Sequence, residues 1–219
     1  MVTLQLKQIR VPPGERVILE DISWQEFETI LIELGEHRGS RVAYSQGLLE
    51  IMVPLPEHEK AKVIIGDLVK ILLDELGLNW EPLGSTTFKR EDMAAGVEPD
   101  DCFYIQNYKL MIGKERIDLS IDPPPDLAIE IDVTSKTKFS AYQALQVPEI
   151  WRYENKLLEI NLLQGKEYIK SETSLVFSIP VKDEIPRFIE MAKTSGTTFA
   201  LKAFRKWVRE YINSSRCHN

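Results

Sequence analysis

The sequence has few of the residues that build several common protein classes. Only two cysteines, Cys102 and Cys217, occur in 219 residues, and they form no CxxC pair. A disulfide scaffold and a zinc ribbon are therefore both poor fits. No apolar run approaches the roughly 18–20 residues that a membrane-spanning helix needs, which argues against an integral membrane protein.

The chain also lacks an excess of positive charge. Its 27 Lys and Arg residues face 34 Asp and Glu residues, so the formal net charge is −7. This balance argues against a protein that coats nucleic acid nonspecifically, although it leaves room for a local basic patch. The first ten residues, MVTLQLKQIR, lack the apolar core and cleavage site of a signal peptide. We therefore expect a cytoplasmic protein with no membrane partner.

Several motifs of common enzymes are missing. Neither GxxxxGK[ST] nor GxGxxG occurs, which disfavours a P-loop nucleotide hydrolase and a Rossmann dehydrogenase. Of the three histidines, His37 and His218 are expected at the surface, so no Ser-His-Asp triad can be assembled. The composition itself, 43% hydrophobic and 28% charged, is typical of an ordinary globular protein.

The spacing of apolar residues predicts a mixture of helices and strands. A capping box at Ser23 and Glu26 predicts a helix over residues 24–36, and apolar spacings of 3 and 4 predict a long helix over residues 57–76. A hairpin with a Gln46-Gly47 turn is expected between them. Further strands are expected at residues 79–82, 86–90, 97–105, 126–133, 150–153 and 157–163, with a small hairpin at 108–119 and a helix at 138–146. This mixture indicates an α/β or α+β fold.

We expect a domain over residues 1–170 and a helical appendage over residues 171–219 that packs on the same domain. Two helices are predicted there, at residues 183–192 and 198–212. The second is amphipathic, with Leu201, Phe204, Val208 and Tyr211 on one face and Lys202, Arg205, Lys206 and Arg209 on another. Docking of the apolar face with a solvated basic face is the favoured interpretation, and contact of the basic face with nucleic acid is the alternative.

Carboxylates gather at the ends of two predicted central strands. Glu98-Pro99-Asp100-Asp101 opens the strand at 97–105, while Glu130 and Asp132 share one face near the end of the strand at 126–133. If the strands are neighbours, Asp100 joins the other two acids. Converging carboxylates repel one another unless a cation lies among them, and oxygen ligands suit Mg²⁺ or Mn²⁺. Taken singly, each motif is more typical of a turn or an exposed edge strand.

Hydroxyl and ammonium groups follow the second strand at Thr134, Ser135, Lys136 and Lys138. A lysine near a metal site can orient the attacking water and stabilise charge on a phosphoryl transition state. In this order, acid, strand, acid, lysine and helix together favour a functional site over a turn and an exposed edge strand.

These segments resemble the Uma-two family of restriction endonucleases, which belongs to the PD-(D/E)XK nuclease superfamily. The resemblance is carried by EPD at 98–100, PDLAIEIDVTS at 125–135, Tyr142, and VPEIWRY at 147–153, with GLLEIM at 47–52 and PEH at 56–58 upstream. It implies a restriction-endonuclease-like fold, a mixed sheet flanked by helices, with a metal-dependent phosphodiesterase site.

The resemblance also assigns roles to residues. Asp100 and Glu130 match the two acids of the family, and the Ile131 carbonyl and Asp132 would complete the metal-binding set. The superfamily pattern has a lysine two residues after the second acid, where this chain has Asp132. The family often moves that lysine to the following helix, where Lys138 matches and Lys136 is the alternative.

Two further residues lie in segments that fit the family. His58 begins the long helix and is more typical of a helix-start or packing residue; the resemblance keeps it near the site without a role. Glu50 lies on the hairpin and could be a further acid of the site, although an exposed strand glutamate is more usual.

Together these observations lead us to expect a Mg²⁺- or Mn²⁺-dependent endonuclease acting on DNA, with Asp100, Glu130 and Lys138 as its catalytic residues. A homodimer is expected because two sites related by a two-fold axis suit the cutting of both strands of a duplex. One alternative is a catalytically inactive relative that binds nucleic acid or a protein partner. Another is a metal-dependent hydrolase of a different phosphoester.

Overall fold

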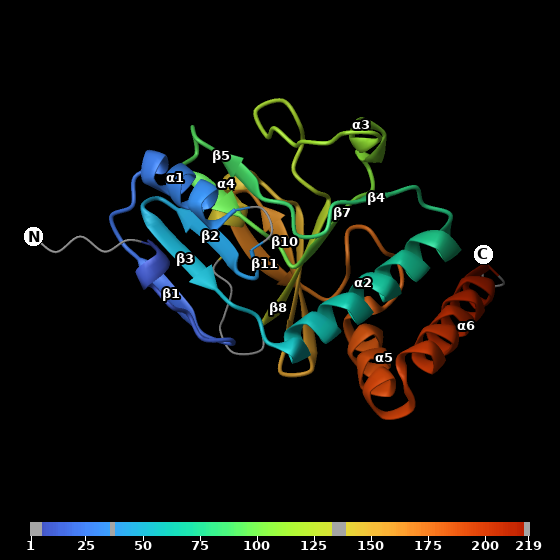
Figure 1. Ribbon diagram of the computed structural model, residues 1–219. Coiled ribbons are helices and arrows are strands. Elements are labelled where there is room, and N and C mark those ends of the chain that lie inside the picture. The colour runs from blue at the N-terminus through green and yellow to red at the C-terminus, as the bar shows by residue number, and fades with distance from the viewer. Residues whose placement is uncertain (1–5, 36–37, 133–138, 217–219) are drawn as a thin grey trace, which may run out of the picture.

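The computed structural model describes residues 6–35, 38–132 and 139–216, which form two sheets surrounded by helices (Figure 1). The first sheet has the order β1-β3-β2-β6-β5 and contains β1 (Arg16–Leu19), β2 (Arg41–Ser45), β3 (Leu48–Met52), β5 (Phe88–Arg90) and β6 (Ala95–Val97). The second has the order β11-β10-β9-β8-β7-β4 and contains β4 (Glu81–Pro82), β7 (Asp101–Tyr104), β8 (Leu127–Asp132), β9 (Glu149–Glu154), β10 (Leu157–Gln164) and β11 (Glu167–Ser171). β8 and β9 run parallel and the other described pairs are antiparallel, so the second sheet is mixed.

All the helices except α3 begin and end close to the positions that local chemistry predicts. They are α1 (Trp24–Leu34), α2 (Pro56–Leu76), α3 (Tyr108–Met111), α4 (Ser140–Leu145), α5 (Val181–Ser195) and α6 (Thr197–Arg216), with a 3-10 turn at Leu6–Gln8. The capping box between Ser23 and Glu26 is present at the start of α1. α2 ends at Gly77, whose φ of 68° is a left-handed conformation that a residue without Cβ adopts readily. None of the described helices is both long and apolar enough to cross a membrane.

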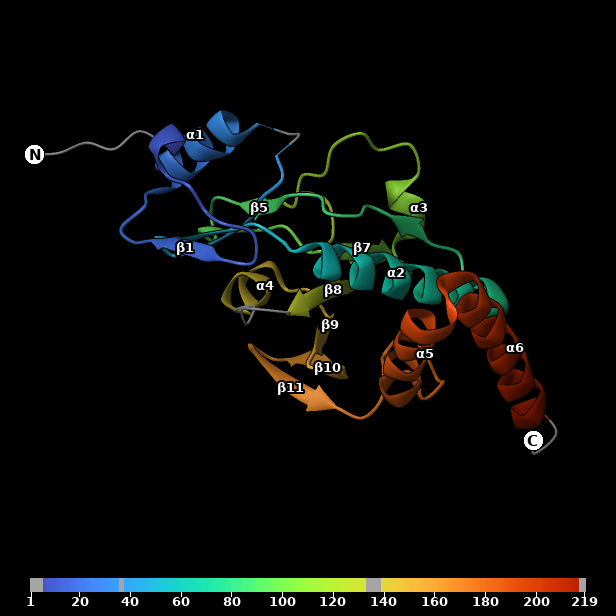
Figure 2. The same ribbon diagram turned by 60° about the horizontal axis from the view of Figure 1, so that its bottom comes forward.

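The largest apolar core joins the second sheet to α2 and to the C-terminal helices. It includes Leu68 and Leu72 of α2, Ile129 of β8, and Phe204 and Val208 of α6, all fully buried. Burial of each such side chain contributes about 1.5–3 kcal/mol. Figure 2 shows α5 and α6 beside α2 at one end of the molecule, with α1 at the other. The apolar face of α6 thus packs on α2 and the second sheet, while the division of the chain at residues 170 and 171 stays a prediction.

The basic face of α6 is partly engaged in ion pairs with α2. Arg205 Nη1 lies 2.5 Å from Glu75 Oε1, and Arg209 Nε lies 2.8 Å from Glu75 Oε2. Lys206 pairs along its own helix with Glu210 at 3.7 Å. Two of the four cations that could have faced nucleic acid therefore help to hold α6 against α2.

The prediction of one continuous strand at residues 97–105 is wrong. The segment at 97–105 divides, because β6 ends at Val97 in the first sheet and β7 begins at Asp101 in the second. Pro99 has no N–H to donate to a ladder, and Glu98 and Asp100 on either side use their carboxylates as hydrogen-bond acceptors. The chain therefore crosses from one sheet to the other at this tripeptide.

The hairpin predicted at 108–119 is also wrong. Its first residues form the short helix α3, and the loop after α3 is held by side chains instead of a strand ladder. Asp122 Oδ2 accepts the N–H of Asp118 at 3.1 Å, and Asp122 also pairs with Lys114. Strands β1 and β11 were not predicted.

Candidate active site

Asp100 is fixed at the point where the chain enters the second sheet. Its N–H donates to the carbonyl of Ile129 at 3.1 Å, and its Oδ2 accepts the N–H of Ile131 at 2.8 Å. The residue is only 2% exposed. Two contacts with β8, one through the backbone and one through the side chain, thus lock the carboxylate beside the strand that carries Glu130.

Glu130 and Asp132 are buried on β8, at 7% and 6% exposure. The hydroxyl of Tyr142, from α4, donates a hydrogen bond to Glu130 Oε1. Burial, and then the charge of Glu130, raise the pKa of Tyr142 well above its usual range, so the phenol stays protonated and remains a donor. Arg152 Nε of β9 lies 3.9 Å from Asp132 Oδ2.

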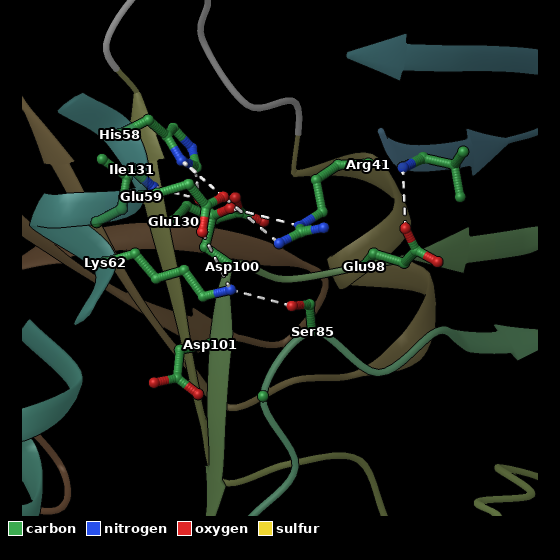
Figure 3. A network of polar contacts seen from close by, with 12 residues as sticks. Arg41, His58, Glu59, Lys62, Ser85, Glu98, Asp100, Asp101, Glu130 and Ile131 are labelled. Atoms are coloured by element: carbon green, nitrogen blue, oxygen red, sulfur yellow. Dashed lines mark hydrogen bonds and ion pairs between the residues drawn. The ribbon is translucent and has the colours of Figure 1, made fainter. Parts of the chain in front are cut away.

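His58 points at Asp100 from the first turn of α2 (Figure 3). Its ring is 3% exposed, and Nε2 lies 3.0 Å from Asp100 Oδ2. That contact lacks hydrogen-bond alignment, and neither ring nitrogen has a hydrogen-bond partner among the described residues. Its closeness to Asp100 shows that the helix-start interpretation was incomplete.

Two cations lie near the acids Asp100 and Glu59. Arg41 of β2 approaches Asp100 from the side opposite His58, with Nε 3.9 Å from Asp100 Oδ1 and Nη2 3.6 Å from Glu59 Oε1 (Figure 3). Lys62 donates to Ser85 Oγ at 3.1 Å and lies 3.9 Å from Glu59 Oε2. The first sheet and α2 therefore both supply positive charge to a site built on the second sheet.

Glu98, the first acid of the EPD run, serves the fold. It pairs with Arg38, accepts a hydrogen bond from the hydroxyl of Thr87, and accepts the N–H of Val42 at 3.2 Å. These contacts tie β2 and the segment before β5 to the crossover. The two acids of one short motif thus have different positions, and only Asp100 reaches β8.

Asp101 faces α2 instead of the other acids. Its Oδ1 accepts the N–H of Cys102 at 2.9 Å, and burial raises the pKa of its carboxyl. Successive side chains of an extended chain point to opposite sides. The neighbouring carboxylates of Asp100 and Asp101 are therefore separated.

A cavity of about 80 Å³ opens against the β8 acids. Glu130, Asp132 and Glu98 line it, together with Arg41. Residues of β2 and β3 form much of the remaining lining, where Glu50 pairs with Arg16 at 3.0 Å. Glu50 therefore lines the same cavity as the β8 carboxylates.

Part of the predicted site cannot be placed. Lys138 and its alternative Lys136, with Thr134 and Ser135, lie outside the described residues, and their roles stay predictions. Ile131 contributes its N–H to Asp100, while the role predicted for its carbonyl stays a prediction. The structure adds three neighbours to which sequence reasoning gave no role.

These neighbours are His58, Arg41 and Tyr142. The PEH run and the position of Tyr142 after the acids were signals for two of them. Nothing local in the sequence marks Arg41, because its approach to Asp100 depends on how the two sheets meet.

The donor chemistry fits a divalent cation. Within the described ranges, no group of three or more His, Cys, Asp or Glu side chains is already gathered in a geometry that could hold an ion. Asp100 and Glu130 nevertheless bury two carboxylates on adjoining segments, and His58 adds an imidazole without a hydrogen-bond partner. A cation offsets the cost of burying like charges together, and carboxylate and imidazole are both common metal ligands.

A comparison with models of protein families shows to which family this chain belongs. Residues 24–190 match the model of Uma2, described as "Putative restriction endonuclease". The chain belongs to the Uma2 family. This is the Uma-two family that the motifs resemble, so that resemblance is confirmed, as is the mixed α/β fold flanked by helices. The matched range of the Uma2 model includes Asp100, Glu130, His58 and Tyr142.

A comparison with solved structures adds a match that covers most of both chains. The crystal structure described as "a putative nuclease belonging to DUF820", from Anabaena variabilis, is 14% identical to this Uma2 protein. The match covers 82% of this chain and 99% of that chain, with a TM-score of 0.49. No curated protein matches.

Proposed function

We propose that this protein is a divalent-metal-dependent endonuclease that hydrolyses phosphodiester bonds in DNA. One observation carries the proposal: Asp100 and Glu130 are both more than nine-tenths buried on adjoining segments of one sheet, with a cavity beside Glu130. Membership in the Uma2 family supports it.

The chain's own contacts would orient the ligands. The N–H of Ile131 holds Asp100 Oδ2, and the hydroxyl of Tyr142 holds Glu130 Oε1. Asp100 and Glu130 would bind Mg²⁺ or Mn²⁺, with help from the Ile131 carbonyl and Asp132. When bound, such an ion supplies Lewis-acid stabilisation of the charge that develops on phosphoryl oxygens. Lys138 would orient the attacking water, with Lys136 as the alternative.

DNA contact would come from local basic residues, because the net charge of the chain is −7. Arg152 is held by Glu159 of β10 and lies near Asp132, and Arg205 and Arg209 are held by Glu75. With these cations already paired, affinity for DNA should be modest. Binding should weaken with salt at a slope near −0.9 per phosphate contacted.

A homodimer remains part of the proposal, since a duplex presents two strands of opposite polarity to two-fold related sites. Light scattering at high micromolar protein concentration tests it, alone and with a DNA duplex. A monomer under both conditions contradicts the dimer and leaves the chemistry of a single site untouched.

The proposed activity is tested by incubating supercoiled plasmid with the protein and Mg²⁺, Mn²⁺ or EDTA. We expect nicked or linear product with either metal and none with EDTA. Binding of DNA without cleavage under all conditions would favour the catalytically inactive alternative. Hydrolysis of a small phosphodiester with intact plasmid would favour the alternative of another phosphoester substrate.

A further inference from the structure

We propose that Arg41 is the residue of this site that binds the phosphate group of the substrate. Its guanidinium donates hydrogen bonds to the non-bridging oxygens of a DNA phosphodiester that enters the cavity beside Glu130. The inference rests on the proposed function for the identity of the substrate, and it assigns a binding role to a residue that sequence reasoning passed over. Its basis is a guanidinium that makes no hydrogen bond with the described residues.

The guanidinium of Arg41 is held only loosely by the protein. The side chain is 19% exposed, and its buried Nε has no hydrogen-bond partner among the described residues. Nη2 lies 3.6 Å from Glu59 Oε1 and Nε lies 3.9 Å from Asp100 Oδ1, and both distances exceed that of a hydrogen bond. Because buried polar atoms are ordinarily paired, a guanidinium with five N–H donors in this state is available to a ligand.

The alternation of side chains along β2 directs Arg41 toward the second sheet. Val42 and Tyr44 are buried in the apolar cluster that joins the first sheet to α1. Ala43, on the other face of β2, packs against a core formed by residues of β7, β8 and α4. Arg41 shares the face of Ala43, because successive side chains of a strand point to opposite sides. Figure 3 shows its side chain directed toward Asp100.

A second arginine lines the same cavity, but it is already engaged. Arg16 and Arg41 each lie opposite Met52, on the two strands that flank β3, so their side chains share one face of the first sheet. Arg16 donates a hydrogen bond to Glu50 Oε2 at 3.0 Å, whereas Arg41 has no such partner among the described residues. Of these two cations, Arg41 is therefore the better placed to bind an incoming anion.

The chemistry of a guanidinium suits a phosphodiester. Its planar fork matches two oxygens of a phosphate, and such charge-assisted pairs are roughly twice as strong as hydrogen bonds between neutral groups. Asp100 competes with the phosphate for this cation, since its carboxylate attracts the guanidinium across 3.9 Å. Loss of the charge of Asp100 should therefore free Arg41 to bind DNA.

The experiment measures binding of the full-length protein to a fluorescein-labelled DNA duplex by anisotropy, over a range of salt. EDTA is present throughout, so that no metal-dependent cleavage occurs. We expect Asp100→Asn to bind the duplex more tightly than the wild type. Adding Arg41→Gln to Asp100→Asn should lower the affinity about 10-fold or more, the scale of one charge-assisted hydrogen bond. It should also reduce the salt slope by about 0.9, the value for one phosphate contact.

Two matched controls separate a phosphate contact from a general effect of charge. Arg16→Gln removes the same charge from the same cavity, and in the Asp100→Asn background it should lower the affinity much less than Arg41→Gln. Glu57→Gln removes an acid from the first turn of α2, where the side chain is 65% exposed and contacts Lys193 at 3.5 Å. It should not increase the effect of Arg41→Gln in the way that Asp100→Asn does.

Arg41→Lys keeps the positive charge but loses the planar fork. In the Asp100→Asn background it should keep the salt slope and still lower the affinity for the duplex. This variant provides the test if Arg41→Gln does not fold.

Unchanged affinity and salt slope on adding Arg41→Gln to Asp100→Asn would overturn the assignment. Equal losses from Arg41→Gln and Arg16→Gln would overturn it too, because only the overall charge of the cavity would then matter. So would Asp100→Asn protein that binds no duplex while the wild type nicks plasmid. All three results leave metal-dependent nicking by the wild type standing. A wild type that neither nicks plasmid nor binds DNA, with Asp100→Asn equally inert, contradicts the inference and the proposed function together.

Discussion

The hydroxyl of Tyr142 donates a hydrogen bond to the carboxylate of Glu130, and both groups are buried. Because burial and the charge of Glu130 raise the pKa of Tyr142 well above its usual range, this phenol stays protonated at neutral pH and remains a donor. The contact therefore orients the carboxylate of Glu130.

Tyr142→Phe should weaken both the fold and the metal site. Removing a donor from a buried carboxylate should lower the free energy of unfolding by about 1.5–3 kcal/mol, and Mn²⁺ affinity should fall about 10-fold. Urea unfolding and calorimetry measure the two effects. Tyr168→Phe is the control, because the half-buried Tyr168 donates its hydrogen bond to the backbone carbonyl of Val147, at 2.6 Å. Equal Mn²⁺ affinities in the two variants would show that Tyr142 matters to stability alone.

Glu149 should make stability depend on pH. Its carboxylate is fully buried and accepts hydrogen bonds from Trp151 Nε1 at 2.5 Å and from the N–H of Leu175 at 2.8 Å. Burial raises the pKa of Glu149, so just above the ordinary carboxyl range the folded state binds more protons than the unfolded state. Its contribution to stability is thus present at low pH and is lost as pH rises through the folded-state pKa.

The measurement compares the free energy of unfolding of the wild type and Glu149→Gln from about pH 4 to pH 8. The wild type should become progressively less stable relative to the variant as pH rises. Glu167→Gln, at an exposed position on β11, should show no such trend. A constant difference between wild type and Glu149→Gln across this range would refute the proposed pH dependence.

Gly66→Ala should destabilise the protein, although alanine normally stabilises a helix interior by roughly 0.5–1 kcal/mol. A Cβ at Gly66 would lie 2.6 Å from Asp101 Oδ2, and Asp101 is anchored by its hydrogen bond with Cys102. The expected loss is about 1–3 kcal/mol, typical of overpacking. In an Asp101→Ala background, Gly66→Ala should lower the free energy of unfolding much less. A Gly66→Ala protein that unfolds at higher urea than the wild type would show that Asp101 moves aside freely.

Substitutions of the two lysines, Lys138 and Lys136, should have different effects on the cleavage rate. If Lys138 positions the attacking water, Lys138→Ala lowers the cleavage rate by about 10²-fold or more and leaves Mn²⁺ affinity nearly unchanged. Lys136→Ala should cost little in rate and slightly weaken DNA binding. The reverse pattern would transfer the role to Lys136, and full activity in both variants would rule out a lysine-assisted mechanism.

Local patterns predicted much of the fold. The capping box placed the start of α1, and the repeat of apolar residues placed α2, because both signals depend on neighbours within a few positions. The split at Pro99 was missed because the choice of sheet for each side of the proline is made by distant pairing partners, β2 for Val97 and β8 for Asp101.

The acids of the site could be found in the sequence, but their surroundings could not. Glu130 stands out because carboxylates are rare inside apolar strands. Asp100 stands out because it belongs to the acidic run at residues 98–101. His58 and Arg41 reach Asp100 only after α2 and the first sheet have packed on β8, and no local spacing encodes that packing.

The most direct test of the metal-dependent nuclease is the rate at which Asp100→Asn nicks plasmid in Mn²⁺, measured beside wild type, Glu130→Gln and Glu57→Gln. The account predicts EDTA-sensitive nicking by wild type and Glu57→Gln. It predicts that Asp100→Asn and Glu130→Gln, while still folded, fall to the background seen with EDTA. Asp100→Asn protein that nicks DNA at the wild-type rate would contradict the account.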